Sequence, residues 1–313
     1  MPGKAIALRK EALEEAVSSF LATLPSGNSR RNYGMDLRLF LKFLEEEGLS
    51  GLKVHEMGPE HISSFRDREG ERVSSSTLRR RLCALRSFFS WAASQGLCAE
   101  NPASALPLPR KNNTHPVILS FPEIERLLSA PDVRKPLGAR DRAMLSLCYY
   151  AGLRVSELCS LRVDSLRWEH FPYKKKLRPA VVVEGKGGRV RAVPLSEEAV
   201  EDIKAWLSVR PEGRGDALLL LRSGDPLTPE AFRYTLRKYA KKAGIGKPVT
   251  PHTLRHSFAS HLARGKVRLD LISDYLGHSD ISTTRIYLHL ADEEYAKGVD
   301  ALPRRIKRGS RLL

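Results

Sequence analysis

The chain has 313 residues, which is enough for two domains that each bury a core of their own. Its 53 lysines and arginines against 36 aspartates and glutamates leave a net charge of +17, and a basic excess of this size points first to a polyanionic partner such as nucleic acid. No uninterrupted apolar run approaches the roughly 18–20 residues needed to cross a bilayer, and the first residues lack the apolar core of a signal peptide, so we expect a cytoplasmic protein without membrane association.

Apolar residues at helical spacing fill the N-terminal third of the chain. They predict a helix over 11–24 and a second one from about residue 29 to Gly48. The clearest helix starts near Ser76 or Thr77, either of which can cap it, and ends before Gly96. A run of charge alone usually marks a solvated face, but in so basic a chain we favour contact with DNA for the arginines that lie largely off the apolar stripe. These are Arg79, Arg80, Arg81 and Arg86.

A stretch rich in proline and asparagine follows, from Asn101 to Pro116. It has no hydrophobic period and is typical of an extended linker between domains. We therefore expect a helical N-terminal domain over 1–107, a linker over 108–118, and a C-terminal domain over 119–313.

The C-terminal domain changes character once along its length. Helices are predicted over 121–131 and within 139–163, and again at 196–209, 229–243, 251–264 and 270–276. Between them, the segments PAVVVEG and VRAVPL predict two short strands around the glycine-rich turn KGGR. The predicted fold class is mainly α, with two domains, of which the second is mixed α/β and holds a small antiparallel sheet.

Two segments of this domain carry side chains suited to phosphodiester chemistry, which requires cations at the non-bridging oxygens and an acid for the leaving oxygen. Arg154 lies in AGLRVSEL, one turn into a helix expected to begin near Gly152, with Glu157 on the same face to hold its guanidinium. Taken alone, this is equally a surface ion pair of little weight. Lys186 lies at the tip of EGKGGR, which is no phosphate-binding P-loop because the first required glycine would fall at Ala180.

A third segment, TPHTLRHSFASHL, carries both histidine and arginine. His252 and Arg255 share one face near the start of a helix that Thr250 can cap, where the positive helix end is suited to a phosphate. Metal ligation is the alternative for His252, His256 and His261, but this segment contains no aspartate or glutamate that could serve as a further ligand. We therefore expect no metal and no cofactor.

The last two candidates are His278, in DYLGHSD, and Tyr287, in RIY. A tyrosine taken singly is more often a core or surface residue than a nucleophile. Together, however, the ordered motifs AGLRVSEL, EGKGGR, HTLRHSFASHL, LGHSDISTT and RIY resemble the tyrosine recombinase (phage integrase) family over about residues 119–295. The segments NYGMDLRLFLKFL and SSSTLRRRL resemble the core-binding domain of the same family. In length and simplicity the chain is most similar to the Xer group, which resolves chromosome or plasmid dimers.

The resemblance implies a covalent mechanism. Tyr287 would attack the scissile phosphate, giving a 3′-phosphotyrosine and a free 5′ hydroxyl, while Arg154 and Arg255 would hold the non-bridging oxygens. Covalent catalysis of this kind divides one hard displacement into two easier ones.

The resemblance also implies the supporting roles. Lys186 would protonate the leaving 5′ oxygen, His252 and His278 would support proton transfer, and Glu157 would hold the arginine. One stretch departs from the family pattern, because WEHFPYKKKLRP is longer and more basic than usual at this place.

The partners implied are double-stranded DNA with a specific recombination site, a homo- or hetero-tetramer working through a Holliday junction, and a DNA translocase as regulator. A segment within residues 291–313 would dock on the neighbouring protomer. The alternatives are an integrase of a phage or transposon and, less favoured, a type IB topoisomerase or a DNA-binding protein without catalysis.

Overall fold

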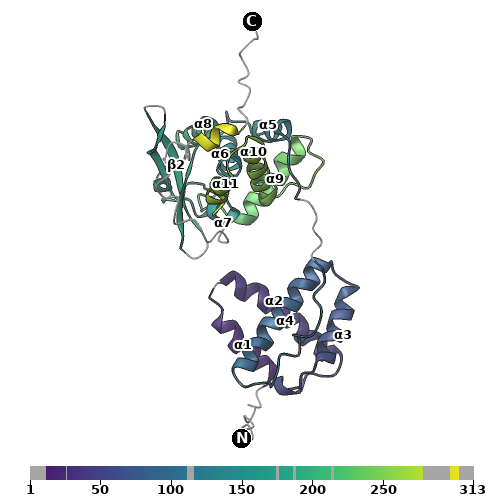
Figure 1. The fold of residues 1–313 in the computed structure, drawn as a ribbon. Helices are drawn as coiled ribbons and strands as arrows, with labels where there is room; N and C mark the ends of the chain where they lie inside the picture. The colour runs from purple at the N-terminus through teal and green to yellow at the C-terminus, as the bar shows by residue number, and fades with distance from the viewer. Residues whose placement is uncertain are drawn as a thin grey trace. The chain divides into compact units, whose positions relative to one another are not determined.

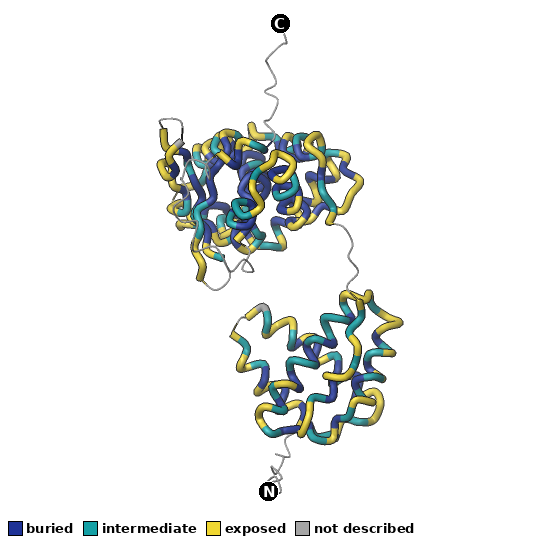
Figure 2. The backbone as a smooth tube through the Cα atoms, in the orientation of Figure 1, coloured by how far each residue is buried: buried dark blue, intermediate teal, exposed yellow. Residues whose placement is uncertain are grey.

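The computed structural model describes residues 12–25, 27–110, 116–173, 176–185, 188–212, 215–277 and 297–302. The chain divides into two compact units, Met1–Thr114 and His115–Leu313 (Figure 1). Each unit has a separate apolar core, and Figure 2 shows the buried residues gathered on the inner sides of the helices and strands. The predicted linker, 108–118, spans the point of division.

The described part of the first unit is helical. Two aromatic contacts join its helices through the core: the rings of Phe40 and Phe65 lie 5.2 Å apart and those of Phe20 and Phe88 lie 5.7 Å apart. Aromatic pairs in this edge-on arrangement add stability beyond the area that they bury. The elements are α1 (Leu13–Thr23), α2 (Gly27–Glu46), a 3-10 turn η1 (Val54–Glu56), α3 (Pro59–Gly70) and α4 (Ser75–Ser94).

Two details of this unit differ from the prediction. The cap of α4 is Ser74, whose hydroxyl accepts the backbone N–H of Thr77, so the predicted caps at Ser76 or Thr77 were wrong by two residues or more. Helix α3 was not predicted. Its contribution to the core is confined to Ile62 and Phe65 among its apolar residues, too few to produce a visible helical period.

The second unit surrounds one buried helix, α6 (Pro136–Tyr150), which contacts α5, α7, α8 and α10. Because α6 is covered on all sides, its sequence is apolar around most of its circumference rather than along one stripe. The other helices are α5 (Phe121–Ser129), α7 (Val155–Cys159), α8 (Glu197–Leu207), α9 (Pro229–Lys242), α10 (Pro251–Arg264) and α11 (Leu269–Leu276), with 3-10 turns η2 (Val163–Ser165) and η3 (Gly298–Ala301).

A three-stranded antiparallel sheet of order β1-β2-β3 completes the described part of this unit. Its strands are β1 (Leu166–Tyr173), β2 (Lys176–Glu184) and β3 (Val190–Pro194). The two predicted strands are β2 and β3, and the basic stretch ahead of them supplies the additional strand β1. The pairing of β1 with β2 is irregular between Arg167 and Phe171. The predicted fold class, mainly α with a small antiparallel sheet in the second domain, is confirmed.

The turn η3 packs on the same chain. Val299 and Leu302 are buried in the core of the second unit, and Asp300 accepts a hydrogen bond of 2.7 Å from Arg178 on β2. For residues 297–302, the structure therefore shows contacts within the chain. The rest of the predicted docking segment, 291–296 and 303–313, lies outside the described residues. Over the ranges that the structure describes, no helix combines the length and apolar character needed to span a membrane.

Candidate active site

Three arginines from different elements converge on the end of α11. The last turn of a helix leaves backbone carbonyls without helical partners and carries partial negative charge, so cations stabilise it. Here three successive carbonyls, those of residues 275–277, each accept a hydrogen bond from a different guanidinium. The pairs are Arg191 Nε with Tyr275 O at 2.9 Å, Arg255 Nη2 with Leu276 O, and Arg154 Nη2 with Gly277 O at 3.0 Å. We call Arg154, Arg191 and Arg255 the arginine cluster.

Gly277 ends α11 in the left-handed conformation, with φ of 60° and ψ of 52°. A side chain is disfavoured at such a backbone angle and would also lack space, because a Cβ here would lie 2.9 Å from Arg191 Nη1. The glycine therefore both stops the helix and lets the cluster approach its end.

Arg154 stands at the residue immediately before α7, with extended backbone angles. The expectation that it lies one turn into a helix beginning near Gly152 was wrong, because Gly152 has φ of 58° and separates α6 from α7. From this position the Arg154 N–H and its Nη1 each donate to Glu157, both at 2.8 Å.

Glu157 is the anion within this cluster. Its side chain is only 3% exposed and accepts hydrogen bonds from Arg191 Nη1 and Nη2, both at 2.9 Å, in addition to those from Arg154. Burial alone would raise the pKa of Glu157, but the hydrogen bonds and charges of the two arginines outweigh it and hold the pKa below its usual value. The carboxylate is thus ionised and fixed in position, unlike a surface pair.

Arg255 is the most buried member of the cluster, at 6% exposed. Its Nη1 donates to Gly152 O at 2.7 Å. Burial, followed by the positive charge of Arg154, lowers the pKa of Arg255 to about 10. The guanidinium is therefore still charged at neutral pH, but the two cations destabilise each other. An anion that binds both relieves that repulsion.

His252 lies in the first turn of α10, exposed to solvent. As predicted, Thr250 caps this helix, accepting the Thr253 N–H at 3.2 Å, and Pro251 occupies the first helical position. A histidine placed there is beside backbone N–H groups that point out of the helix and can bind an anion.

The three histidines considered for metal ligation have separate surroundings. The rings of His252 and His256 lie 6.4 Å apart, and burial, then the charges of His252 and Arg255, lowers the pKa of His256. His261 is buried, with Nδ1 2.7 Å from the Tyr149 hydroxyl. Within the described ranges, no three His, Cys, Asp or Glu side chains gather into a metal-binding group.

Lys186, His278 and Tyr287 lie outside the described residues. The residues that precede two of them are described. A Cβ at Gly185, just before Lys186, would lie 3.6 Å from Arg191 Nη1 and 3.8 Å from Glu157 Oε1. The carbonyl of Gly277, just before His278, accepts a hydrogen bond from Arg154. Gly185 and Gly277, the described neighbours of Lys186 and His278, therefore both lie beside the arginine cluster.

The four arginines predicted to contact DNA all have partners within the first unit. Arg80 pairs with the buried Asp36 on α2, and Arg81 pairs with Glu69 on α3. Such contacts tie α4 to its neighbours, and a role in binding DNA stays a prediction. Arg79 donates to Pro109 O at 2.9 Å and Arg86 to Ala103 O at 2.9 Å.

Arg191 was not predicted from the sequence. The structure shows its unusual placement, because the apolar Val190 at the start of β3 is exposed while the neighbouring Arg191 is largely covered. An arginine on the covered side of a strand implies a partner anion, but Glu157 is 34 residues away and no local spacing connects them.

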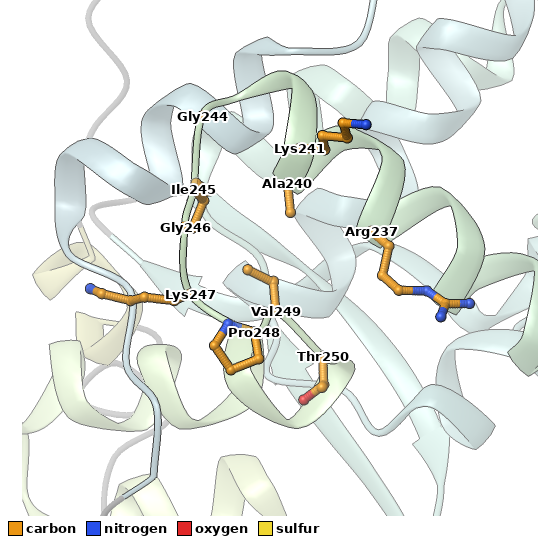
Figure 3. Close-up of a pocket in the computed structure, with 10 residues that line it drawn as sticks. All are labelled: Arg237, Ala240, Lys241, Gly244, Ile245, Gly246, Lys247, Pro248, Val249 and Thr250. Carbon is orange, nitrogen blue, oxygen red and sulfur yellow. The ribbon is translucent and has the colours of Figure 1, made fainter.

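A shallow hollow of about 550 Å³ lies where α9 leads into α10 (Figure 3). Apolar side chains line it together with three long, positively charged side chains. One of these, Lys247, is held by Glu123 Oε2 at 2.8 Å. The lining residues are Arg237, Ala240, Lys241, Gly244, Ile245, Gly246, Lys247, Pro248, Val249 and Thr250. The arginine cluster does not line this hollow.

Comparison with known proteins assigns both units. The model of the phage integrase family matches residues 118–294, and the model of the phage integrase N-terminal SAM-like domain matches residues 17–96. The tyrosine recombinase XerD of Pseudomonas aeruginosa is 38% identical over 276 residues, covering 84% of this chain and 87% of its own. The tyrosine recombinase XerC of Xanthomonas campestris pv. campestris is 36% identical over 304 residues, covering 95% and 91%.

Solved structures agree on the fold. The XerH site-specific recombinase, bound to a palindromic difH substrate in a post-cleavage complex, aligns with a TM-score of 0.68 at 21% identity, covering 95% of this chain and 91% of that one. A lambda integrase fragment, solved as a dimer bound to a core site, aligns with a TM-score of 0.68 at 17% identity, covering 86% and 94%.

Proposed function

The chain belongs to the phage integrase family of tyrosine recombinases, and from that premise we propose which of its residues cut and rejoin DNA. It is a DNA-cleaving and rejoining enzyme, similar over most of its length to recombinases named XerC and XerD. Its reaction needs groups that bind the scissile phosphate, a nucleophile and a proton donor for the leaving oxygen.

Arg154 and Arg255 bind the non-bridging oxygens of the scissile phosphate. The support is their shared anchorage at the end of α11 and the lowered pKa of Arg255, which an anion between the two cations would reverse. Arginine suits this task because its planar fork stays charged and matches pairs of phosphate oxygens. His252, at the first turn of α10, adds a hydrogen-bond donor to the same phosphate.

Tyr287 is the nucleophile. Its phenol oxygen forms a bond to phosphorus as the bond from phosphorus to the 5′ oxygen breaks, and the departing oxygen takes a proton from Lys186. The phenol proton passes to the histidine pair, His252 and His278. Because one phosphate ester replaces another, a 5′ hydroxyl of the partner strand can reverse the step without an external energy source.

The observation that carries this proposal is the convergence of the arginine cluster on the end of α11, directly before the segment that holds His278 and Tyr287. The test is a nicked substrate from which the short 5′ strand diffuses away after cleavage, so that a covalent adduct accumulates. We expect the adduct with the unaltered chain and none with Tyr287→Phe, at equal DNA binding.

Tyr234→Phe is the matched control, since Tyr234 is an exposed tyrosine on α9. It should form the adduct at the unaltered rate. An adduct formed by the Tyr287→Phe chain would remove Tyr287 from its role.

We place the reaction in the cytoplasm, with a tetramer resolving chromosome or plasmid dimers under the control of a DNA translocase. The similarity to XerC and XerD, over 95% and 84% of the chain, supports this over an integrase of a mobile element. Sequencing the genomic DNA joined to the adduct distinguishes them: one chromosomal site supports dimer resolution, and element ends contradict it.

A further inference from the structure

We propose that Arg191 is a positioning residue for DNA cleavage, holding Glu157, the end of α11 and the base of the Lys186 turn in one arrangement. The inference rests on the proposed function, because it concerns how Arg154 and Lys186 reach the phosphate. Arg191 itself acts through these groups and does not contact the phosphate.

All three nitrogens of the Arg191 guanidinium donate inside the protein. Nη1 and Nη2 bind the two oxygens of Glu157 at 2.9 Å each, and Nε binds Tyr275 O at 2.9 Å. The side chain is 13% exposed. A paired fork of this kind fixes both the distance and the angle between its partners, which a single ammonium does not. Arg191 therefore joins β3 rigidly to α7 and α11.

Glu157 transmits this constraint to Arg154. Its Oε1 accepts from Arg154 and Arg191 together, at 2.8 and 2.9 Å. Without Arg191, the buried carboxylate would lose two of its four donors and the largest of the influences that keep its pKa low. Arg154 would then be held by a carboxylate free to rotate, and the guanidinium would no longer be fixed for a phosphate oxygen.

The third connection leads to the turn between β2 and β3. Arg191 pairs in register with Val183, near the base of this turn. The Gly185 N–H donates to Arg189 O at 2.7 Å and so closes the base of the turn. A Cβ at Gly185 would lie 3.6 Å from Arg191 Nη1. The base of the turn that bears Lys186 is thus seated on the same guanidinium that orients Glu157.

The alternative is that Arg191 only stabilises the fold, as buried ion pairs often do when one partner is removed. The chain offers a matched control. Arg142 on α6 is 14% exposed, and its Nε lies 3.1 Å from the buried Asp202 on α8. This pair has similar burial and joins α6 to α8, two helices that carry no member of the arginine cluster. Arg142→Met measures what losing a comparable ion pair does to the enzyme.

The experiment compares Arg191→Met with Arg142→Met in the chain of 313 residues. Three quantities are measured: the single-turnover rate of adduct formation on the nicked substrate at saturating enzyme, the affinity for that DNA, and the melting temperature. We expect Arg191→Met to slow adduct formation by about 10²-fold, as for a small misplacement of catalytic groups, with little change in affinity. Arg142→Met should lower the melting temperature similarly and leave the rate near that of the unaltered chain.

Two further variants test whether a folding defect explains the loss of rate and whether Arg191 acts through Glu157. Arg191→Lys keeps the charge but not the fork, so it should fold and still lose much of the rate. Adding Arg191→Met to Glu157→Gln should slow the reaction by much less than the product of the two single losses, because part of what Arg191 does passes through the Glu157 carboxylate.

Equal rate losses for Arg191→Met and Arg142→Met, or fully multiplicative losses in the double variant, would overturn the inference. These outcomes are separate from failure of the proposed function, which is judged by the Tyr287→Phe adduct in the same assay.

Discussion

Gly277 matters to the site through the space that it leaves as well as through its backbone angle. An alanine in the left-handed region costs roughly 1–2 kcal/mol of stability at any position. At Gly277 the new Cβ would also displace the Arg191 guanidinium. We predict that Gly277→Ala slows adduct formation strongly, in addition to losing this stability.

Gly244, after α9, is the control for that prediction. It has nearly the same φ, 65°, but nothing within 4 Å of its Cβ position. Gly244→Ala should lose a similar free energy of unfolding, measured by urea titration, while its cleavage rate stays unchanged. Equal rates for the two variants would mean that the space beside Arg191 is unimportant.

For single residues, the sequence was a good guide to which side chains matter and a poor guide to contacts between residues far apart in the chain. The spacing of three between Arg154 and Glu157 indicated their pairing, and Thr250 and Pro251 indicated the start of α10. Arg191 was invisible because its partners lie 34 and 84 residues away. Lys186, His278 and Tyr287 remain predictions from their motifs.

The packing of α5, α6 and α10 encloses His261. Its ring centre lies 4.0 Å from that of Phe121 on α5, and its Nδ1 is 2.7 Å from the Tyr149 hydroxyl on α6. Burial, followed by the charge of Arg264, lowers the pKa of His261 to about 4. Between pH 6.5 and 4 the unfolded chain therefore binds a proton at this residue that the folded chain does not.

The stability that neutral His261 contributes is thus complete above pH 6.5 and is lost as the pH falls towards 4, by roughly 3 kcal/mol in all. Urea titrations at pH 7.5, 6 and 5 should show this slope in the unaltered chain and a shallower one in His261→Gln. Replacing the exposed His170 by Gln should leave the slope unchanged. A slope that survives in His261→Gln would assign the acid sensitivity to other groups.

Most helices could be predicted from apolar period and capping residues, whereas β1 could not. In its sequence, LRWEHFPY, the charged and proline residues interrupt any alternation. Such a strand forms only because β2 is available to pair with it, and as an edge strand it can accommodate Pro172. The information that specifies β1 lies in its partner rather than in itself.

For the molecule as a whole, the net charge of +17 and the arginine cluster have different consequences. Binding to DNA should weaken with salt at a log–log slope near −0.9 for each phosphate contacted. Arg154→Ala removes at most one such contact, so its slope should change by about 1, whereas its cleavage rate should fall by about 10²–10³. Filter binding across a salt series and the adduct assay measure the two effects. A slope near zero would contradict electrostatic binding by this chain.

The successive carbonyls of residues 275–277 make the length of α11 a fixed quantity. Each added residue turns a helix by about 100°, so one alanine inserted between Leu269 and Leu276 would swing all three acceptors away from Arg154, Arg191 and Arg255 at once. Exchanging exposed side chains along α11 leaves those acceptors where they are. This helix should therefore tolerate many exchanges of surface residues but no change in the number of its residues.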